Sequence, residues 1–216
     1  MPSANSEGEG VTEEVTRSIL RTSYPEHFGD LESYAEILRT RGIEWGLLGP
    51  READKIWDRH ISNSLALLDV VGRGVDVADI GSGAGLPGIP LALCRDDLRI
   101  TLLEPLLRRY NFLLLAVEEL DLGERVRVQR LRAEDCDETF DVVTCRAVAP
   151  LEKLLKWITP MFFPDGELLA LKGTGAESEI EAARKRLNDY RMTAQVLHVY
   201  AAPGIEGTRA IRVLAK

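Results

Sequence analysis

A glycine-rich segment near the middle of the chain constrains the fold more than any other feature. It spans residues 79–85, with the sequence DIGSGAG, and it follows a short apolar run at residues 75–80. Glycine adopts backbone conformations that other residues avoid, and its missing Cβ lets a ligand approach the backbone closely. A buried strand that ends in such a loop is typical of an open α/β sheet that binds a nucleotide-like cofactor.

Strand-like and helix-like patterns alternate after residue 70. Apolar runs that predict buried strands fall at residues 75–80, 99–104, 126–129, 140–145, 166–172, 193–200 and 210–214. Helical patterns follow the first, second, fourth and fifth runs, at residues 89–94, 106–120, 151–158 and about 177–187. This alternation indicates a mostly parallel sheet covered on both faces. The last two runs are joined by a short connection, which indicates an antiparallel strand at that edge. This order predicts an α/β fold: a Rossmann-like class I methyltransferase with a seven-stranded, mostly parallel sheet and one antiparallel edge strand.

The N-terminal third has a different character. Residues 1–14 are small, polar and acidic, which predicts a disordered acidic tail. Apolar residues at helical spacing then indicate an N-terminal helical extension over residues 15–70. We expect residues 71–216 to form the cofactor-binding domain.

The residues around the glycine loop favour S-adenosylmethionine as the cofactor. A dinucleotide-binding fingerprint would need a glycine at position 86, where this chain has Leu86. The glycines fall instead at positions 81, 83 and 85 and are preceded by Asp79, whose carboxylate suits the ammonium and sulfonium charges of S-adenosylmethionine. Glu104 ends the next strand, where a carboxylate can accept hydrogen bonds from both ribose hydroxyls. We therefore assign Asp79, Gly81, Gly83, Gly85, Leu86 and Glu104 to the cofactor site.

Two later strand ends extend the same predicted site. Glu134 or Asp135 follows the third strand, where an acid can bind the adenine amino group while the backbone of Ala133 reads the ring edge. Arg146 ends the fourth strand. Because the carboxyl ends of parallel strands line the ligand crevice of such sheets, we expect Ala133, Glu134 and Arg146 to contact the cofactor.

Composition excludes several other classes of protein. Three scattered cysteines suggest a reducing cytoplasm, and no Cys/His cluster has metal-ligand spacing, so neither a disulfide framework nor a metal is expected. No apolar run reaches the length of a membrane span, and the polar start is not a signal peptide. The net charge of −8 argues weakly against nucleic acid, yet basic residues cluster at 51–60. Phosphate binding needs only a local basic face.

The loop and its continuation resemble a known family. Residues 79–91 read DIGSGAGLPGIPL, and this string is similar to that of the RsmG family, also called GidB. Arg59-His60, Cys145-Arg146-Ala147 and Leu171-Lys172-Gly173 agree with further motifs of that family, over roughly residues 30–216. The resemblance implies transfer of a methyl group from S-adenosylmethionine to N7 of a guanine in 16S ribosomal RNA of the bacterial small subunit.

The resemblance also implies which residues face the substrate. Cofactor contacts fall at Gly81, Leu86, Ala133, Glu134 and Arg146, and the side that faces RNA carries Arg51, Arg59, His60, Lys172 and Arg209. One segment departs from the family. Many members have an Asn-Leu-Thr stretch where this chain has Gly46-Leu47-Leu48, so a polar contact expected there is missing.

The implied reaction needs no general base, because N7 of guanine carries a lone pair and no proton. We assign no catalytic residue, and we expect Arg146 and Lys172 to position cofactor or substrate. N7 lies in the deep, narrow groove of an RNA helix, so the target guanine should be unpaired or flipped out. Other readings are a methyltransferase of a small molecule or protein, and a non-catalytic RNA- or nucleotide-binding module. A monomer is the default assembly.

Overall fold

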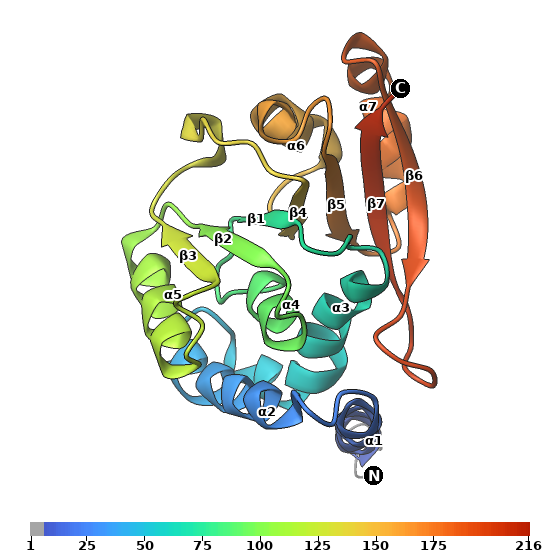
Figure 1. The fold of residues 1–216 in the computed structure, drawn as a ribbon. Coiled ribbons are helices and arrows are strands. Elements are labelled where there is room, and N and C mark those ends of the chain that lie inside the picture. The colour runs from blue at the N-terminus through green and yellow to red at the C-terminus, as the bar shows by residue number, and fades with distance from the viewer. Residues whose placement is uncertain (1–6) are drawn as a thin grey trace.

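The computed structural model describes residues 7–216, which form one seven-stranded sheet flanked by helices (Figure 1). The strands are β1 (Asp76–Ile80), β2 (Arg99–Leu103), β3 (Val126–Gln129), β4 (Val142–Arg146), β5 (Glu167–Lys172), β6 (Met192–Val199) and β7 (Thr208–Ala215). Their order is β3-β2-β1-β4-β5-β7-β6. The first five strands pair in parallel, whereas β7 pairs antiparallel with both β5 and β6. The predicted class I methyltransferase fold is confirmed, and β7 is inserted one place inside the edge strand β6.

The described residues contain seven α-helices. They are α1 (Glu7–Ser23), α2 (Phe28–Ile37), α3 (Ser62–Leu65), α4 (Gly88–Cys94), α5 (Leu107–Glu119), α6 (Leu151–Ile158) and α7 (Ala176–Asp189). Short π or 3-10 turns are η1 (Leu38–Gly42), η2 (Pro50–Lys55), η3 (Ile56–Ile61), η4 (Ala66–Asp69), η5 (Ala133–Asp135) and η6 (Thr159–Met161). Figure 1 places α6 and α7 on the opposite side of the sheet from α2 and α4. Within residues 7–216, every helix is too short or too polar to cross a lipid bilayer.

Strand β5 illustrates how the two apolar layers form. Leu168 and Ala170 belong to the hydrophobic cluster that includes α6 and α7, whereas Leu169 and Leu171 belong to the cluster that includes α2 and α4. Successive side chains of a strand point to opposite faces, so a continuous apolar run is needed where both faces are covered. This explains why the central residues of β5, 168–171, form an unbroken apolar run.

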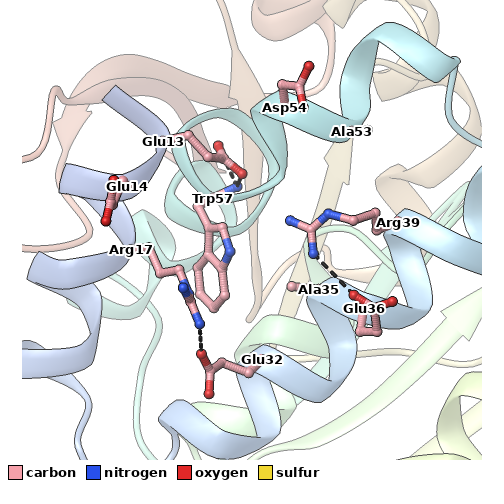
Figure 2. Close-up of a pocket in the computed structure, with 10 residues that line it drawn as sticks. All are labelled: Glu13, Glu14, Arg17, Glu32, Ala35, Glu36, Arg39, Ala53, Asp54 and Trp57. Carbon is pink, nitrogen blue, oxygen red and sulfur yellow. Dashed lines mark hydrogen bonds and ion pairs between the residues drawn. The ribbon is translucent and has the colours of Figure 1, made fainter. Parts of the chain in front are cut away.

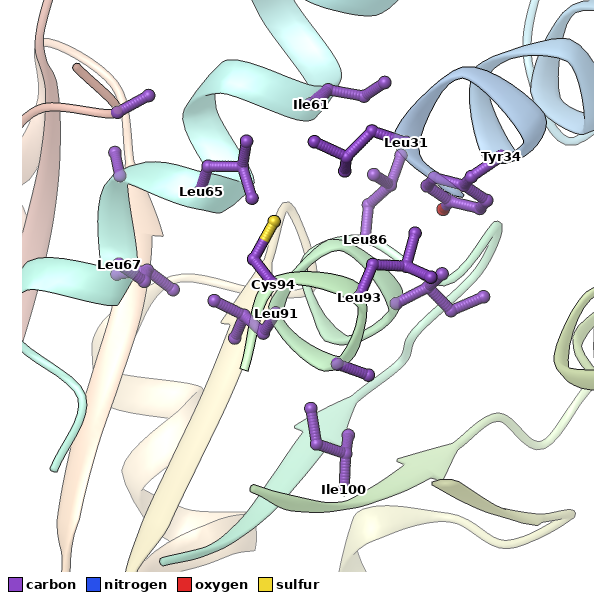
Figure 3. Close-up of a cluster of buried hydrophobic side chains, with 14 of the residues drawn as sticks. Leu31, Tyr34, Ile61, Leu65, Leu67, Leu86, Leu91, Leu93, Cys94 and Ile100 are labelled. Carbon is purple, nitrogen blue, oxygen red and sulfur yellow. The ribbon is translucent and has the colours of Figure 1, made fainter. Parts of the chain in front are cut away.

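The N-terminal helices pack over α4, which directly follows the glycine loop. Figure 3 shows Leu31 and Tyr34 of α2, with Ile61 and Leu65 of the η3–α3 segment, around Leu86, Leu91 and Leu93. All of these side chains are buried. The helical segment therefore shares a hydrophobic core with the helix behind the loop and holds that loop in place.

Helix α1 begins earlier than the sequence predicts. The sequence predicts a disordered acidic tail over residues 1–14, whereas the structure has α1 starting at Glu7. Residues 1–6 lie outside the described part of the chain. The carboxylate of Glu13 accepts hydrogen bonds from the backbone N–H groups of Trp57 and Asp58, at 3.0 and 3.2 Å, and Leu20 is fully buried. The acidic composition of this segment does not indicate that Glu13 anchors the helix to residues 57 and 58.

The phenol of Tyr34 ties α2 to the glycine loop and provides a test of that anchoring. Its hydroxyl donates to the carbonyl oxygen of Ala84 at 2.7 Å, and the side chain is fully buried. Tyr34→Phe should leave that carbonyl unpaired and lower the free energy of unfolding by about 1–3 kcal/mol in urea titration. Tyr190→Phe is the control, because Tyr190 is only half-buried and its hydroxyl lies at 3.4 Å from Arg186. Equal stabilities for the two variants would contradict the anchoring role.

Candidate active site

The glycine loop runs from the carboxyl end of β1 to α4. Gly81, Gly83 and Gly85 all have positive φ angles, of 63°, 59° and 94°. Residues with a Cβ avoid this region, so the loop requires glycine at these three positions. The N–H of Gly81 donates to the carbonyl of Leu103 in β2 at 2.8 Å. A Cβ at Gly85 would lie 2.4 Å from Ile89, so the loop is closely packed on its inner side.

Asp79 lies beneath this loop and is completely buried. Its Oδ2 accepts a hydrogen bond from the N–H of Gly88 at 3.0 Å, while Oδ1 has no hydrogen-bond partner in the described residues. Burial raises the pKa of Asp79 to about 7, against the opposing effects of the Gly88 and Ser82 hydrogen bonds and the charge of Arg146. A buried carboxylate with a free oxygen suits a positively charged ligand group.

Glu104 follows β2 and closes the other side of the loop. Its side chain is almost fully buried. Oε2 accepts from the N–H of Gly83 at 3.1 Å and Oε1 from the N–H of Leu106 at 2.9 Å, so both oxygens are fixed in direction. Leu86 points its side chain into the hydrophobic core (Figure 3), and only its backbone is available for the cofactor contact expected there.

The turn η5 places Ala133 and Glu134 beyond β3. The end of β3 is joined to the Glu104 segment, because the N–H of Glu104 donates to the carbonyl of Gln129 at 3.1 Å. Ala133 is buried and Glu134 is exposed. The predicted cofactor residues therefore follow the carboxyl ends of adjacent strands β1, β2 and β3, and Arg146 follows at the end of β4.

A cavity of about 660 Å³ adjoins the loop on its β4 and β5 side. Its lining includes Arg59, His60, Arg146 and Lys172, which come from η3, β4 and β5. Val148 connects it to the cofactor site, since this side chain lines the cavity and a Cβ built at Gly81 would meet it at 2.9 Å. Four residues predicted from three separate sequence motifs therefore share one cavity.

Arg146 and His60 set the electrostatics of this cavity. The side chain of Arg146 forms no hydrogen bond or ion pair with another residue in the described part of the chain, and burial lowers its pKa. Nε2 of His60 lies 2.9 Å from a carboxylate oxygen of Glu52. Burial and the nearby charge of Arg146 lower the pKa of His60 to about 4, against the effect of Glu52. His60 is therefore a neutral side chain at physiological pH.

Lys172 is held more tightly than the sequence indicates. Only 9% of its side chain is exposed. Nζ donates to the carbonyl of Ala149 at 2.9 Å and lies 2.8 Å from Oε2 of Glu179. That same oxygen accepts the N–H of Leu151, the first residue of α6, at 2.8 Å.

Arg51 and Arg209 lie outside the cavity lining. Arg51 is exposed on η2, next to Glu52, which bonds Arg59 at 3.2 Å. Arg209 is the β7 residue opposite Lys172 and lies 3.9 Å from Glu177. Neither arginine is therefore brought into the cavity that holds Arg59, His60, Arg146 and Lys172.

Sequence reasoning missed three residues that shape the site. The sequence assigns no role in the site to Tyr34, Glu52 or Glu179. Glu52 holds both Arg59 and His60, and Glu179 holds Lys172. Each acid lies seven or eight residues from its basic partner, a spacing that no short motif detects.

A second cavity, of about 620 Å³, lies among the N-terminal helices (Figure 2). It contains none of the predicted site residues. Its lining carries five acidic side chains (Glu13, Glu14, Glu32, Glu36 and Asp54) against two arginines (Arg17 and Arg39). Arg17 pairs with Glu32 and Arg39 with Glu36, and Trp57 stacks on Phe28 with ring centroids 5.3 Å apart. We assign this cavity to helix packing.

Residues 7–216 contain no group of acids, histidines or cysteines arranged to hold a metal ion.

Known proteins identify the family. A family model described as GidB, rRNA small subunit methyltransferase G, matches residues 28–205. A ribosomal RNA small subunit methyltransferase G of Streptomyces avermitilis is 51% identical over 183 residues, covering 83% of this chain and 76% of that protein. The chain belongs to the rRNA small subunit methyltransferase G family. This confirms the resemblance drawn from the glycine loop and the expected class of enzyme.

Further comparisons distinguish membership of the family from a shared fold. The methyltransferase G of Thermobifida fusca is 45% identical over 207 residues, covering 94% of this chain and 87% of that protein. A solved precorrin-6y C5,15-methyltransferase of Geobacter metallireducens shares only 15% identity. It covers 79% of this chain and 91% of its own, with a TM-score of 0.53. That likeness shows the fold alone, whereas the two methyltransferase G relatives match this chain over most of their own length.

Proposed function

We propose that the chain transfers a methyl group from S-adenosylmethionine to N7 of a guanine in 16S ribosomal RNA of the small subunit. One observation carries the proposal beyond the family assignment. Arg59, His60, Arg146 and Lys172 meet in one cavity that touches the glycine loop through Val148. A substrate in this cavity would be next to the cofactor site, as direct transfer requires.

The residues around the loop fit S-adenosylmethionine. Asp79 has a buried oxygen without a hydrogen-bond partner in the described residues, which suits the cationic methionine end. Glu104, held in direction by two backbone N–H groups, suits the ribose hydroxyls. Ala133 and Glu134 would lie along the adenine ring. When bound, this cofactor supplies a methyl group activated by a positively charged sulfur.

The chain's own residues have a limited chemical task. N7 offers a lone pair and loses no proton, so the cavity needs no general base. Arg146 stays protonated and cannot accept a proton, and His60 is neutral. These side chains bind and orient the target nucleotide and exclude water from the reacting atoms.

The substrate test measures where the methyl group goes. Small ribosomal subunits from a strain that lacks the corresponding enzyme are incubated with the protein and cofactor labelled in its methyl group. We expect label in 16S RNA and none in ribosomal proteins. Label in proteins or free nucleosides would favour a different methyltransferase. No binding of cofactor at millimolar concentration, measured by calorimetry, would instead favour a non-catalytic binding module.

Lys172→Ala tests the division between the two sites. It removes a cation from the cavity while leaving the glycine loop untouched. We expect the KM for small subunits to rise about tenfold, which is typical of one lost charge-assisted hydrogen bond, with cofactor affinity within about twofold. The control is Lys185→Ala on the outer part of α7, which should change neither quantity. Loss of cofactor binding in Lys172→Ala would contradict the division.

We also propose that the chain works as a cytoplasmic monomer. Its large exposed apolar side chains are spread over several elements, with Val15 in α1, Leu114 in α5 and Leu214 in β7. Scattered apolar residues of this kind do not form an interface patch. Light scattering at micromolar concentration should give the mass of one chain, and a dimer mass would contradict this.

A further inference from the structure

The cavity beside the glycine loop contains one acidic side chain among its lining residues, that of Glu179. It projects from the first turn of α7, and 29% of the side chain is exposed. Oε2 is occupied, because it accepts the N–H of Leu151 and lies 2.8 Å from Nζ of Lys172. Oε1 makes no hydrogen bond with the described residues, so the carboxylate is fixed in place by one oxygen and retains an acceptor on the other.

Lys172 is the donor half of the same pair. Its ammonium group has three protons. One points to the carbonyl of Ala149 and one to Glu179, which leaves one donor. With 9% of its side chain exposed, Lys172 has little freedom to turn elsewhere. A fixed donor and a fixed acceptor therefore lie side by side on one wall of the cavity.

This arrangement is complementary to guanine. The Watson–Crick edge of guanine presents the O6 acceptor next to the N1–H and 2-amino donors, and flipped-out bases are commonly read on this edge. Lys172 can donate to O6, while Oε1 of Glu179 can accept from N1–H or the 2-amino group. Adenine presents an amino donor and a ring-nitrogen acceptor in the same places. Its donor would therefore face the donor of Lys172, and its acceptor would face the acceptor of Glu179.

Charge gives Glu179 a second role. When the N7 lone pair forms the bond to the methyl carbon, the electron pair of the broken bond stays on sulfur and the guanine ring gains a positive charge. The other ionised side chains that line the cavity, Arg59, Arg146 and Lys172, are cationic and would oppose that charge. A carboxylate next to the N1–H of guanine offsets this repulsion, because N1–H becomes more acidic as the positive charge develops on the ring.

We propose that Glu179, held by Lys172, is a specificity-determining residue that selects guanine and stabilises the cationic ring as methylation proceeds. This inference rests on the proposed function, because it takes N7 of guanine as the acceptor. Glu179 interacts more strongly with the methylated ring than with the unmodified one. It therefore contributes to the rate constant of the transfer more than to substrate binding.

Glu179→Gln is the test variant. Glutamine keeps the shape of the side chain and an oxygen for the Leu151 N–H, but it loses the negative charge. We expect kcat on small subunits to fall about 10- to 100-fold, with KM within about threefold, as for removal of one group that stabilises developing charge. Glu181→Gln is the matched control, because Glu181 is on the same helix and pairs with Arg184 outside the cavity. Its kcat should match that of the parent chain.

A binding measurement separates this role from a structural one. Affinities for 7-methyl-GMP and GMP are measured by calorimetry at slightly acidic pH, with the protein saturated with S-adenosylhomocysteine. The parent chain and Glu181→Gln should prefer the cationic 7-methyl-GMP by about tenfold, and Glu179→Gln should lose this preference. A parent chain that labels 16S RNA but shows no preference, or a preference that survives Glu179→Gln, would overturn the inference. A parent chain that fails to label 16S RNA would overturn the proposed function itself.

Discussion

Gly81→Val is expected to abolish cofactor binding while the protein stays folded. The φ angle at Gly81 is +63°, a region that a β-branched residue rarely adopts. An added Cβ would lie 2.9 Å from Cγ2 of Val148, so Val148 would be displaced at the border between the loop and the cavity. The valine methyl groups would fill the space over which the cofactor must approach the backbone. Calorimetric titration should show a loss of affinity greater than about 100-fold, which corresponds to roughly 3 kcal/mol.

The control for this variant is Gly74→Val. Gly74 has a nearly identical φ angle of +64°, but an added Cβ would meet no atom within 4 Å. It therefore carries the same backbone strain, of about 1–2 kcal/mol, without filling the cofactor site. We expect Gly81→Val to lose at least as much stability in urea as Gly74→Val, because Val148 must also shift, and only Gly81→Val to lose cofactor affinity. Equal cofactor affinities would contradict the placement of the cofactor against Gly81.

Cofactor affinity is expected to fall steeply as the pH drops below 7. Burial raises the pKa of Asp79 to about 7, with Arg146 lowering it and Glu104 raising it by smaller amounts. A cationic ligand favours the ionised carboxylate, so binding should lower this pKa and release a proton. The dissociation constant should therefore increase by up to tenfold for each unit of pH below 7 and level off above about 8. Calorimetry in buffers of different ionisation enthalpy measures the released proton directly.

Asp79→Asn separates this carboxylate from other titrating groups. The amide keeps an acceptor for the Gly88 N–H but has no charge, so cofactor affinity should be weak and independent of pH between 6 and 8. The substitution should weaken cofactor binding but stabilise the fold at pH 8. Because the pKa of Asp79 is higher in the folded than in the unfolded chain, its ionisation destabilises the fold as pH rises from about 4 to 7. Asp79→Asn should therefore unfold at higher urea than the parent chain at pH 8, and a lower midpoint there would contradict the buried, ionisable role.

The parallel half of the sheet could be predicted from the sequence because its determinants are local. Residues 75–80 are mostly apolar, with Asp76 and Asp79 as the exceptions, and the glycines that follow are required by positive φ angles at Gly81, Gly83 and Gly85. The prediction that this loop binds a cofactor rests on the same residues. The insertion of β7 between β5 and β6 is different, because strand order within a sheet depends on long-range pairing that periodicity does not encode.

Without the family resemblance, the candidate site was predictable only where residues follow strand ends. Asp79, Glu104 and Arg146 are at the carboxyl ends of β1, β2 and β4, or directly after them, and their convergence follows from parallel pairing. Tyr34 and Glu179 act through contacts with segments 50 and 28 residues away, at Ala84 and Leu151. Their types and spacing match ordinary core and surface positions, so only the fold reveals them.

The most direct test of the whole account is the chemical identity of the labelled nucleoside. Small subunits methylated by this protein with labelled S-adenosylmethionine are stripped of protein, and their 16S RNA is digested to nucleosides and separated by chromatography. We predict that the label co-migrates with 7-methylguanosine, at about one methyl group per subunit. Label in any other nucleoside would contradict the proposed placement of guanine N7 beside the glycine loop.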